Sequence, residues 1–219
     1  MVSGSMQRDG QGAWCYLINA ARCFTPPGQP DEGRLLEGLR VSRRGVAWHG
    51  VTYVDYHRRF DALVERLRAT GGWGGVPHPW FDVLLPESRA ESSVGALLSG
   101  LSDEDVGPTG VVLICPLLRS PSPRPLLRTP DEDRSYLFHI MTAAPSASLN
   151  PAFVTRMLSR NRRLFELARR DGGTLYPIGA VPMSRADWSN HYGTAWHGLL
   201  RQKAQHDPDS ILTPGPGVF

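Results

Sequence analysis

The spacing of apolar residues predicts helices in several parts of the protein. Residues 54–70 carry apolar side chains three and four positions apart, which is typical of an amphipathic helix. Residues 151–170 show the same spacing, and Asn150 followed by Pro151 is a common N-cap and first helical residue. Shorter helices are predicted at three further places: residues 31–40, residues 88–101 and the stretch that begins at Ser184.

Other stretches alternate apolar and polar residues or are short and apolar, as β-strands are. In the strand bracketed by prolines before residue 86, alternation places Trp80, Asp82 and Leu84 on one face. Residues 1–12 show neither pattern, and we expect a disordered lead there. Strands are predicted over residues 14–18, 80–85, 110–117, 135–143 and 174–181.

The order of these elements favours an α+β fold. Strands alternate with helices without an internal repeat, which predicts an antiparallel or mixed sheet flanked by helices. A length of 219 residues allows a core of ordinary size, and we assign residues 13–219 to one domain. Alternation along the strand at 135–143 separates two sets of side chains: Tyr136, Phe138, Ile140 and Thr142 on one face, and Leu137, His139 and Met141 on the other.

Charge and hydropathy exclude some classes of protein. The net charge is only +3, and the arginines at 156, 160, 163 and 170 more often form a solvated or ion-paired helix face than a nucleic-acid surface. The sequence has neither an apolar run of about 18 residues nor the apolar core of a secretory leader. We therefore expect a cytoplasmic protein that contacts neither membrane nor nucleic acid.

Cysteines and common motifs give no sign of a metal or nucleotide site. Cys15, Cys23 and Cys115 fit no metal-ligand spacing and are odd in number, which argues against zinc and against a disulfide framework. The glycines at 71–75 do not open a helix with dinucleotide-binding spacing, and there is no phosphate-binding loop or G-x-S-x-G motif.

One short block has the composition of a ligand wall. Trp80 offers an indole face for a flat ring, and Asp82, two residues on, offers an acceptor for the N–H of that ring. The alternative interpretation is a packing corner, because Pro77 and Pro79 hold His78 in an extended conformation.

The order of several blocks resembles the C-terminal substrate-binding part of the cytokinin dehydrogenase family of FAD-dependent oxidases. Pro-His-Pro-Trp at 77–80 carries the likeness most clearly, together with Trp-x-x-His-Tyr-Gly at 188–193 and Asp-Pro-x-x-Ile-Leu-x-Pro-Gly at 207–215. The resemblance runs from about Trp14 to Phe219, and its remaining blocks are residues 14–21, 51–56 and 107–116.

The resemblance implies an FAD-dependent oxidoreductase that cleaves the bond between the side-chain carbon and the nitrogen of N6-substituted adenines or a related amine. The family's FAD-tethering histidine, aspartate base and purine-binding glutamate precede the region that this protein resembles. We therefore expect the partner to be an FAD-binding domain, encoded upstream or on a separate polypeptide, which binds most of the FAD. The tail at 207–219 is expected to return toward that domain, and an isolated half should expose an apolar surface.

The resemblance also assigns candidate site residues. Trp80 corresponds to the family's pocket tryptophan, and Asp82 stands where asparagine is usual. Leu63 replaces a pocket glutamate of some members, Phe60 replaces an aliphatic residue, and either Met141 or Thr142 falls at a pocket leucine. A gap-free alignment puts Ile178 and Gly179 at a tyrosine and a leucine near the flavin and the substrate pocket. A two-residue slip gives Tyr176 the tyrosine's place, and Pro216 replaces a glutamine near FAD. The competing hypothesis is a catalytically inactive fragment or small-molecule binding module without redox chemistry.

Overall fold

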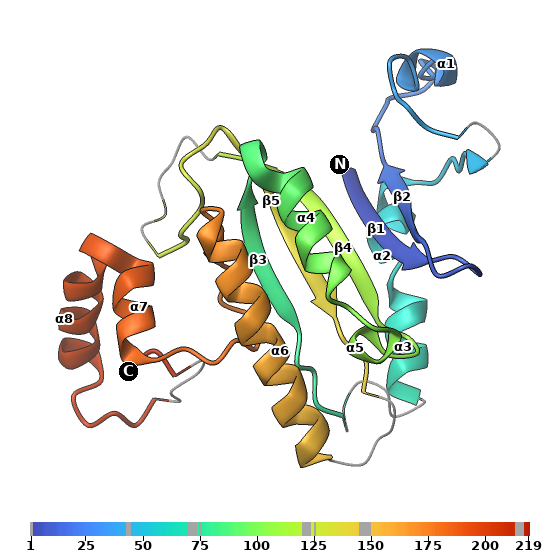
Figure 1. Ribbon diagram of the computed structural model, residues 1–219. Helices are drawn as coiled ribbons and strands as arrows, with labels where there is room; N and C mark the ends of the chain where they lie inside the picture. Colours follow the sequence, from blue (N-terminus) through green and yellow to red (C-terminus); the bar gives the residue numbers. More distant parts are fainter. Residues whose placement is uncertain are drawn as a thin grey trace. The chain divides into compact units, whose positions relative to one another are not determined.

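The computed structural model describes residues 2–42, 45–69, 74, 76–119, 124, 126–144, 150–212 and 217–219 (Figure 1). The protein divides into two compact units, which we describe separately. The larger unit comprises Val2–Asn19 and Gly75–Phe219, and the smaller unit comprises residues 20–74.

A six-stranded sheet forms the centre of the larger unit. Its strand order is β2-β1-β4-β5-β3-β6, and the pairs β1–β4, β4–β5, β5–β3 and β3–β6 are antiparallel. This confirms the predicted α+β class with an antiparallel sheet. The strands are β1 (Val2–Arg8), β2 (Trp14–Ala20), β3 (Phe81–Pro86), β4 (Val111–Leu118), β5 (Arg134–Met141) and β6 (Thr174–Leu175).

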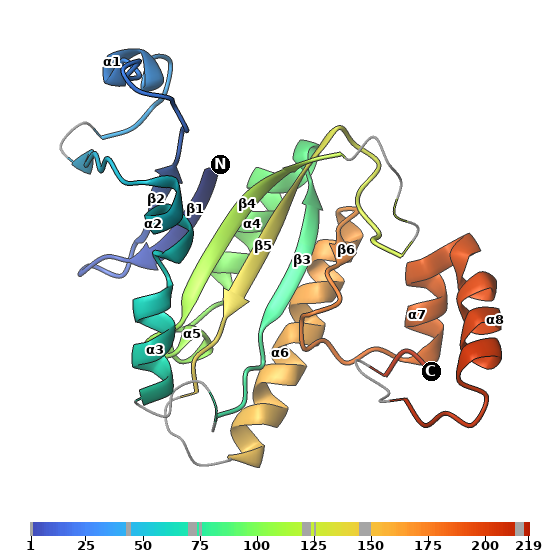
Figure 2. The same ribbon diagram turned by 180° about the vertical axis from the view of Figure 1, so that it is seen from behind.

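Two helices cover one face of this sheet, α4 (Ala90–Ser99) and α6 (Pro151–Arg170), as Figures 1 and 2 show from opposite sides. Helix α6 has the predicted bounds, with the Asn150 side chain accepting a hydrogen bond from the Phe153 N–H. The core between sheet and helices is apolar. It includes Phe81, Val83 and Leu85 from β3, Phe138 and Ile140 from β5, Val112 from β4, Leu97 and Leu98 from α4, and Leu164, Phe165 and Ala168 from α6.

Short elements join these layers, and a helical pair lies toward the C-terminus. The connections include η2 (Glu87–Arg89) and α5 (Asp103–Val106). The pair consists of α7 (Arg185–Tyr192) and α8 (Trp196–His206), which η3 (Gly193–Ala195) joins. The predicted start at Ser184 is confirmed, because Ser184 and Asp187 form a capping box. The Tyr192 ring stacks on Trp188 on one side and on Trp196 on the other, which packs α7 and α8 together.

The first strand corrects the prediction of a disordered lead over residues 1–12. Strand β1 pairs with β4 in the register Gly4↔Ile114 and Met6↔Val112. Its side chains are mostly small or polar, and Met6 is its only fully buried residue, so the alternation that reveals a strand is missing. Backbone hydrogen bonds to β4, which no pattern within residues 1–12 encodes, hold it in the sheet.

The strand predicted over residues 174–181 is also wrong beyond its first two residues. Strand β6 ends at Leu175, and a turn follows in which the Gly179 N–H donates to the Tyr176 carbonyl at 3.1 Å. Pro177 has no N–H to continue the ladder. The backbone returns to β3 at Ala180, whose N–H donates to the Trp80 carbonyl at 2.7 Å.

The smaller unit contains short helices: α1 (Glu32–Leu35), α2 (Tyr53–Arg58) and α3 (Asp61–Ala69). The helix predicted over 54–70 is therefore divided near Arg59, and the helix predicted over 31–40 is reduced to four residues. None of the side chains on these three helices is buried. Apolar spacing alone overestimated their length, because longer helices draw most of their stability from packing.

Candidate functional site

Asp82 on β3 and His139 on β5 form a polar pair within the sheet. The register places them directly opposite each other, and Asp82 Oδ1 contacts His139 Nδ1 within hydrogen-bond distance. The Asp82 side chain is fully buried and the His139 side chain is 16% exposed. Burying a carboxyl group costs free energy unless the group is hydrogen-bonded, and the contact with His139 provides that hydrogen bond for Asp82.

The second oxygen of Asp82 lies against Gly179. Oδ2 is buried and has no hydrogen-bond partner among the described residues. A Cβ added at Gly179 would lie 3.2 Å from this oxygen and 2.9 Å from the Asp82 backbone nitrogen. The site therefore requires glycine at 179, as the close approach of the turn to β3 leaves no room for a side group.

The turn after β6 also carries Tyr176 and Ile178, two of the residues that the family resemblance associated with the cofactor. The Tyr176 N–H donates to the Asp82 carbonyl at 3.2 Å, whereas the Ile178 side chain is 61% exposed. The structure thus brings Tyr176 and Gly179 to Asp82 and leaves Ile178 at the surface. Which of Tyr176 and Ile178 takes the family tyrosine's place stays a prediction, and Pro216 lies outside the described residues.

Asn161 on α6 fastens the two segments that carry these residues. Its Nδ2 lies 3.0 Å from the Pro79 carbonyl, 3.1 Å from the Trp80 carbonyl and 2.9 Å from the Ala180 carbonyl. The Asn161 side chain is fully buried. One amide therefore holds the segment before β3 and the turn after β6 side by side.

Arg160 completes this buried network. Its Nη2 donates to Asn161 Oδ1 at 2.7 Å and to Thr142 Oγ1 at 2.9 Å, and its Nη1 donates to the Asp105 carbonyl. Burial lowers the pKa of Arg160 to about 10, so the guanidinium stays charged at neutral pH. Arg160 is only 2% exposed and belongs to the interior, not to a basic surface stripe.

The hydrogen bonds of this network distinguish Thr142 from Met141, the two candidate pocket residues at the end of β5. The Thr142 hydroxyl, fully buried, donates to the Asp105 carbonyl at 2.9 Å in addition to accepting from Arg160, so its hydrogen bonds are used within the protein. Met141 lies two residues after His139, which puts it on the same face of the sheet. This arrangement favours Met141 as the neighbour of the Asp82–His139 pair.

Three further residues, Trp80, Phe60 and Leu63, were also predicted to belong to the site. Trp80 comes immediately before β3, two residues ahead of Asp82 on the extended segment, and its ring contacts His78 edge-on with centroids 5.4 Å apart. Phe60 and Leu63 belong to the smaller unit, where they are 55% and 43% exposed. Their part in the site stays a prediction.

The sheet face that carries His139 is apolar and partly open. Leu113 on β4 is the cross-strand neighbour of His139, and alternation along β4 puts Val111 and Leu117 on the same face. Their side chains are 39% and 38% exposed. Cys115 lies between them on this face, and burial raises the pKa of its thiol. This strand face is therefore apolar and partly accessible to solvent.

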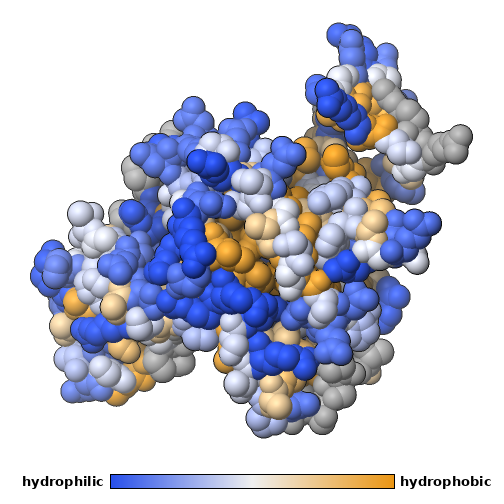
Figure 3. All heavy atoms as spheres, viewed as in Figure 1, coloured by the Kyte–Doolittle hydropathy of each residue, from blue (hydrophilic) through white to orange (hydrophobic). Residues whose placement is uncertain are grey.

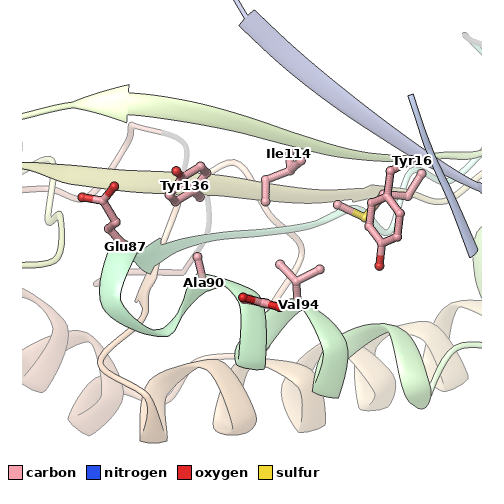
Figure 4. A pocket seen from close by; sticks show the side chains of 8 residues that line it. Tyr16, Glu87, Ala90, Val94, Ile114 and Tyr136 are labelled. Atoms are coloured by element: carbon pink, nitrogen blue, oxygen red, sulfur yellow. The ribbon is translucent and has the colours of Figure 1, made fainter. Parts of the chain in front are cut away.

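A different hollow lies on the helix side of the sheet (Figure 4). It has a volume of about 520 Å³, and its walls come from β1, β2, β4, β5, η2 and α4. Hydrophobic side chains interrupt the hydrophilic surface around α4 and the N-terminal strands in Figure 3. Among the polar groups that line the hollow is Glu87, which forms an ion pair with Arg134 at 3.2 Å. The hollow is lined by Met6, Tyr16, Glu87, Ala90, Glu91, Val94, Ile114 and Tyr136.

The part of the protein that the structure describes offers neither a metal cluster nor a membrane span. No group of three or more His, Cys, Asp or Glu side chains there is arranged to hold a metal ion. Among the same residues, no helix is both long enough and apolar enough to cross a membrane.

His139 is the site residue that sequence reasoning missed. Alternation along residues 135–143 placed it on the face opposite Phe138, as observed, but gave it no partner. The pairing with Asp82 depends on the β3–β5 register, which joins positions 57 residues apart. A buried aspartate in an otherwise apolar strand was the one available signal that a partner existed.

An antiparallel sheet with helices on one face is consistent with the α+β substrate-binding domain of FAD-linked oxidases. Comparison with known proteins gives the family. Residues 6–219 match the family model described as "Cytokinin dehydrogenase 1, FAD and cytokinin binding", and the chain belongs to this family.

Individual relatives have similar names. An uncharacterized oxidoreductase, ORF5 in the fasciation locus of Rhodococcoides fascians, is 35% identical over 98% of this chain and 47% of its own length. In Oryza sativa subsp. japonica, cytokinin dehydrogenase 4 is 29% identical over 99% of this chain and 41% of its own, and cytokinin dehydrogenase 5 is 35% identical over 86% and 35%. The chain spans less than half the length of these curated relatives.

Proposed function

We propose that this protein is the substrate-binding part of an FAD-dependent oxidoreductase that oxidises the bond between the side-chain carbon and the nitrogen of an N6-substituted adenine or a related amine. The observation that carries the proposal is the buried Asp82–His139 pair beside Trp80, in a sequence matched to the FAD and cytokinin binding family over residues 6–219. The reaction requires an FAD-binding domain, supplied upstream or by a separate polypeptide.

The residues of this protein bind and orient the substrate. Trp80 presents a large flat ring on which a purine stacks. The Asp82–His139 pair offers hydrogen bonding within an apolar face, where a polar contact is stronger than in water. Gly179 lets the backbone approach this pair closely. Together these groups hold one orientation of the substituent to be oxidised, which is how a protein assists a cofactor reaction.

The residues present fit one end of FAD. The open face around Val111 and Leu117 is apolar, as the flat ring of a flavin requires, and the backbone turn at Tyr176–Gly179 adjoins it through Asp82. Tyr176, Ile178 and Pro216 are the residues proposed to lie near the ring. FAD, when bound, would accept the hydride from the carbon beside nitrogen. The phosphates would be held by the FAD-binding domain.

The same open face is the proposed contact surface for that domain. Its exposed valine and leucine side chains on β4 are of the type that domain interfaces bury. The limited coverage of the relatives, 47% and 41% of their lengths, supports a further domain in the functional protein.

The visible absorption spectrum of the protein isolated from its native host, with the mass of everything that copurifies, tests this proposal. We expect a flavin spectrum together with a second polypeptide or a longer one, and oxidation of N6-benzyladenine by that preparation. A colourless protein of 24.2 kDa that takes up no added FAD would contradict it.

The alternative is a small-molecule binding module without redox chemistry. It is favoured by the fact that Trp80, Asp82 and His139 all come from this one polypeptide and need no second domain to come together. Purine binding by the colourless protein would establish it.

A further inference from the structure

We propose that Asp82 orients His139 so that its Nε2 accepts a hydrogen bond from an N–H of the bound ligand, which makes His139 a ligand-binding residue. This inference rests on the proposed function and adds to it the chemistry that the ligand must present. No pattern in the sequence assigned His139 to the site.

The contact with Asp82 selects which nitrogen of the neutral imidazole ring carries the proton. Nδ1 lies against Asp82 Oδ1. When Asp82 is a carboxylate, its oxygens only accept hydrogen bonds, and this contact then requires the proton on Nδ1. In the neutral ring Nε2 is then an acceptor, because the two nitrogens share one proton. A carboxylate that fixes the tautomer of a histidine in this way is a recurrent arrangement in binding and catalytic sites.

The Nε2 end of the ring is the accessible end of the pair. Nε2 lies on the side of the ring away from Nδ1, and it has no hydrogen-bond partner among the described residues. The His139 side chain keeps 16% exposure, whereas its partner Asp82 has none. A ligand can therefore reach the pair at His139 Nε2 but not at Asp82.

The surroundings of Nε2 are apolar. His139 is opposite Leu113 on β4, and its neighbours on the same face of β5 are Leu137 and Met141. A lone acceptor in an apolar surface selects a mostly apolar ligand that brings a matching donor. An N6-substituted adenine has this composition: a flat ring, an apolar substituent and N–H groups.

Two probes provide the test: N6-benzyladenine, and its derivative in which methyl groups replace the hydrogens on N6 and N9. We expect His139→Phe to weaken binding of N6-benzyladenine about five- to tenfold and to leave binding of the methylated probe unchanged. Leu137→Ala, on the same face of the same strand, is the matched control and should affect both probes equally. Equal affinity of wild type and His139→Phe for N6-benzyladenine would overturn the inference while leaving the proposed function standing.

His139→Phe leaves Asp82 buried without a partner, so a second variant guards against misfolding. Asp82→Leu combined with His139→Phe removes both polar groups and should melt cooperatively while showing the same loss of discrimination between the probes. Nitrogen-15 NMR of the wild type should show an unprotonated Nε2 whose resonance shifts when N6-benzyladenine is added. A protonated Nε2 in the neutral ring would overturn the inference. Failure of the wild type to bind N6-benzyladenine at all would reject the substrate class of the proposed function, and the ligand role of His139 with it.

Discussion

Arg162 on α6 and Asp187 in the first turn of α7 form a two-pronged ion pair: Nη1 is 2.7 Å from Oδ2 and Nη2 is 3.1 Å from Oδ1. The same carboxylate accepts hydrogen bonds from the Ser184 backbone N–H and hydroxyl. One aspartate thus caps α7 and connects it to the helix that covers the sheet. Its hydrogen bonds to Arg162 hold the pKa of Asp187 well below its usual range.

Asp187→Asn should destabilise the protein by about 1–2 kcal/mol at pH 7, because a charge-assisted pair and part of a cap are lost. Since the folded pKa is depressed, the contribution is present above the unfolded pKa near 4 and disappears as the pH falls through the folded value. Urea unfolding at pH 7 and pH 3 should therefore show a larger difference between wild type and variant at pH 7. Asp209→Asn, at an exposed position, serves as the control. An equal difference at both pH values would contradict this account.

His191 on α7 should make the protein less stable in mild acid. Burial and the nearby Arg128 guanidinium lower its pKa to about 4, from an ordinary value of 6.5. The folded state therefore binds the proton less well than the unfolded state, so this contribution is complete above pH 6.5 and is lost as the pH falls toward 4. Unfolding free energies measured between pH 7 and pH 4 should decline more steeply for wild type than for His191→Phe. Parallel declines would refute the assignment.

Gly179→Ala tests the close approach of the turn to β3. The new methyl group would lie 2.9 Å from the Asp82 nitrogen, and relieving that contact should cost about 1–3 kcal/mol. We expect weaker binding of N6-benzyladenine as well, because Asp82 and its partner must shift. Gly95→Ala is the matched control: it has open space around it on α4 and should be neutral or stabilising. Thermal melting should show a lower Tm for Gly179→Ala and an unchanged or higher Tm for Gly95→Ala.

Asn161→Leu removes the amide that reaches the Pro79, Trp80 and Ala180 carbonyls. Three backbone carbonyls lose their common donor, so we expect destabilisation of about 2–4 kcal/mol. The tryptophan fluorescence response to N6-benzyladenine should weaken too, as the segment carrying Trp80 is no longer fixed. Asn190→Leu, on the exposed side of α7, should change neither property. A fully stable Asn161→Leu variant would show that the network is not needed to hold the two segments.

The parts of the fold that could be predicted from the sequence are those with local signals. Helix α6 was predicted within its observed bounds, because Asn150–Pro151 opens it and glycines follow it, and Ser184 marks α7 through its capping box. Strand β1 and the turn after Leu175 depend on contacts with distant strands. For the site, composition indicated Trp80 and Asp82 and the family resemblance indicated Gly179, whereas His139 required the register and Asn161 required the packing of α6 against the strand ends.

The position of β1 between β2 and β4 has a consequence for how the protein could be shortened. Gly4 packs so closely on Ile114 that a Cβ there would lie 2.8 Å from its Cγ2, and the Met6–Val112 pairing joins segments that are far apart in sequence. Removing residues 2–8 would leave the backbone of β4 as a free edge next to exposed valine and leucine side chains, a surface that recruits strands from other molecules. Residues 2–8 thus keep the backbone of β4 paired on both sides in the intact protein.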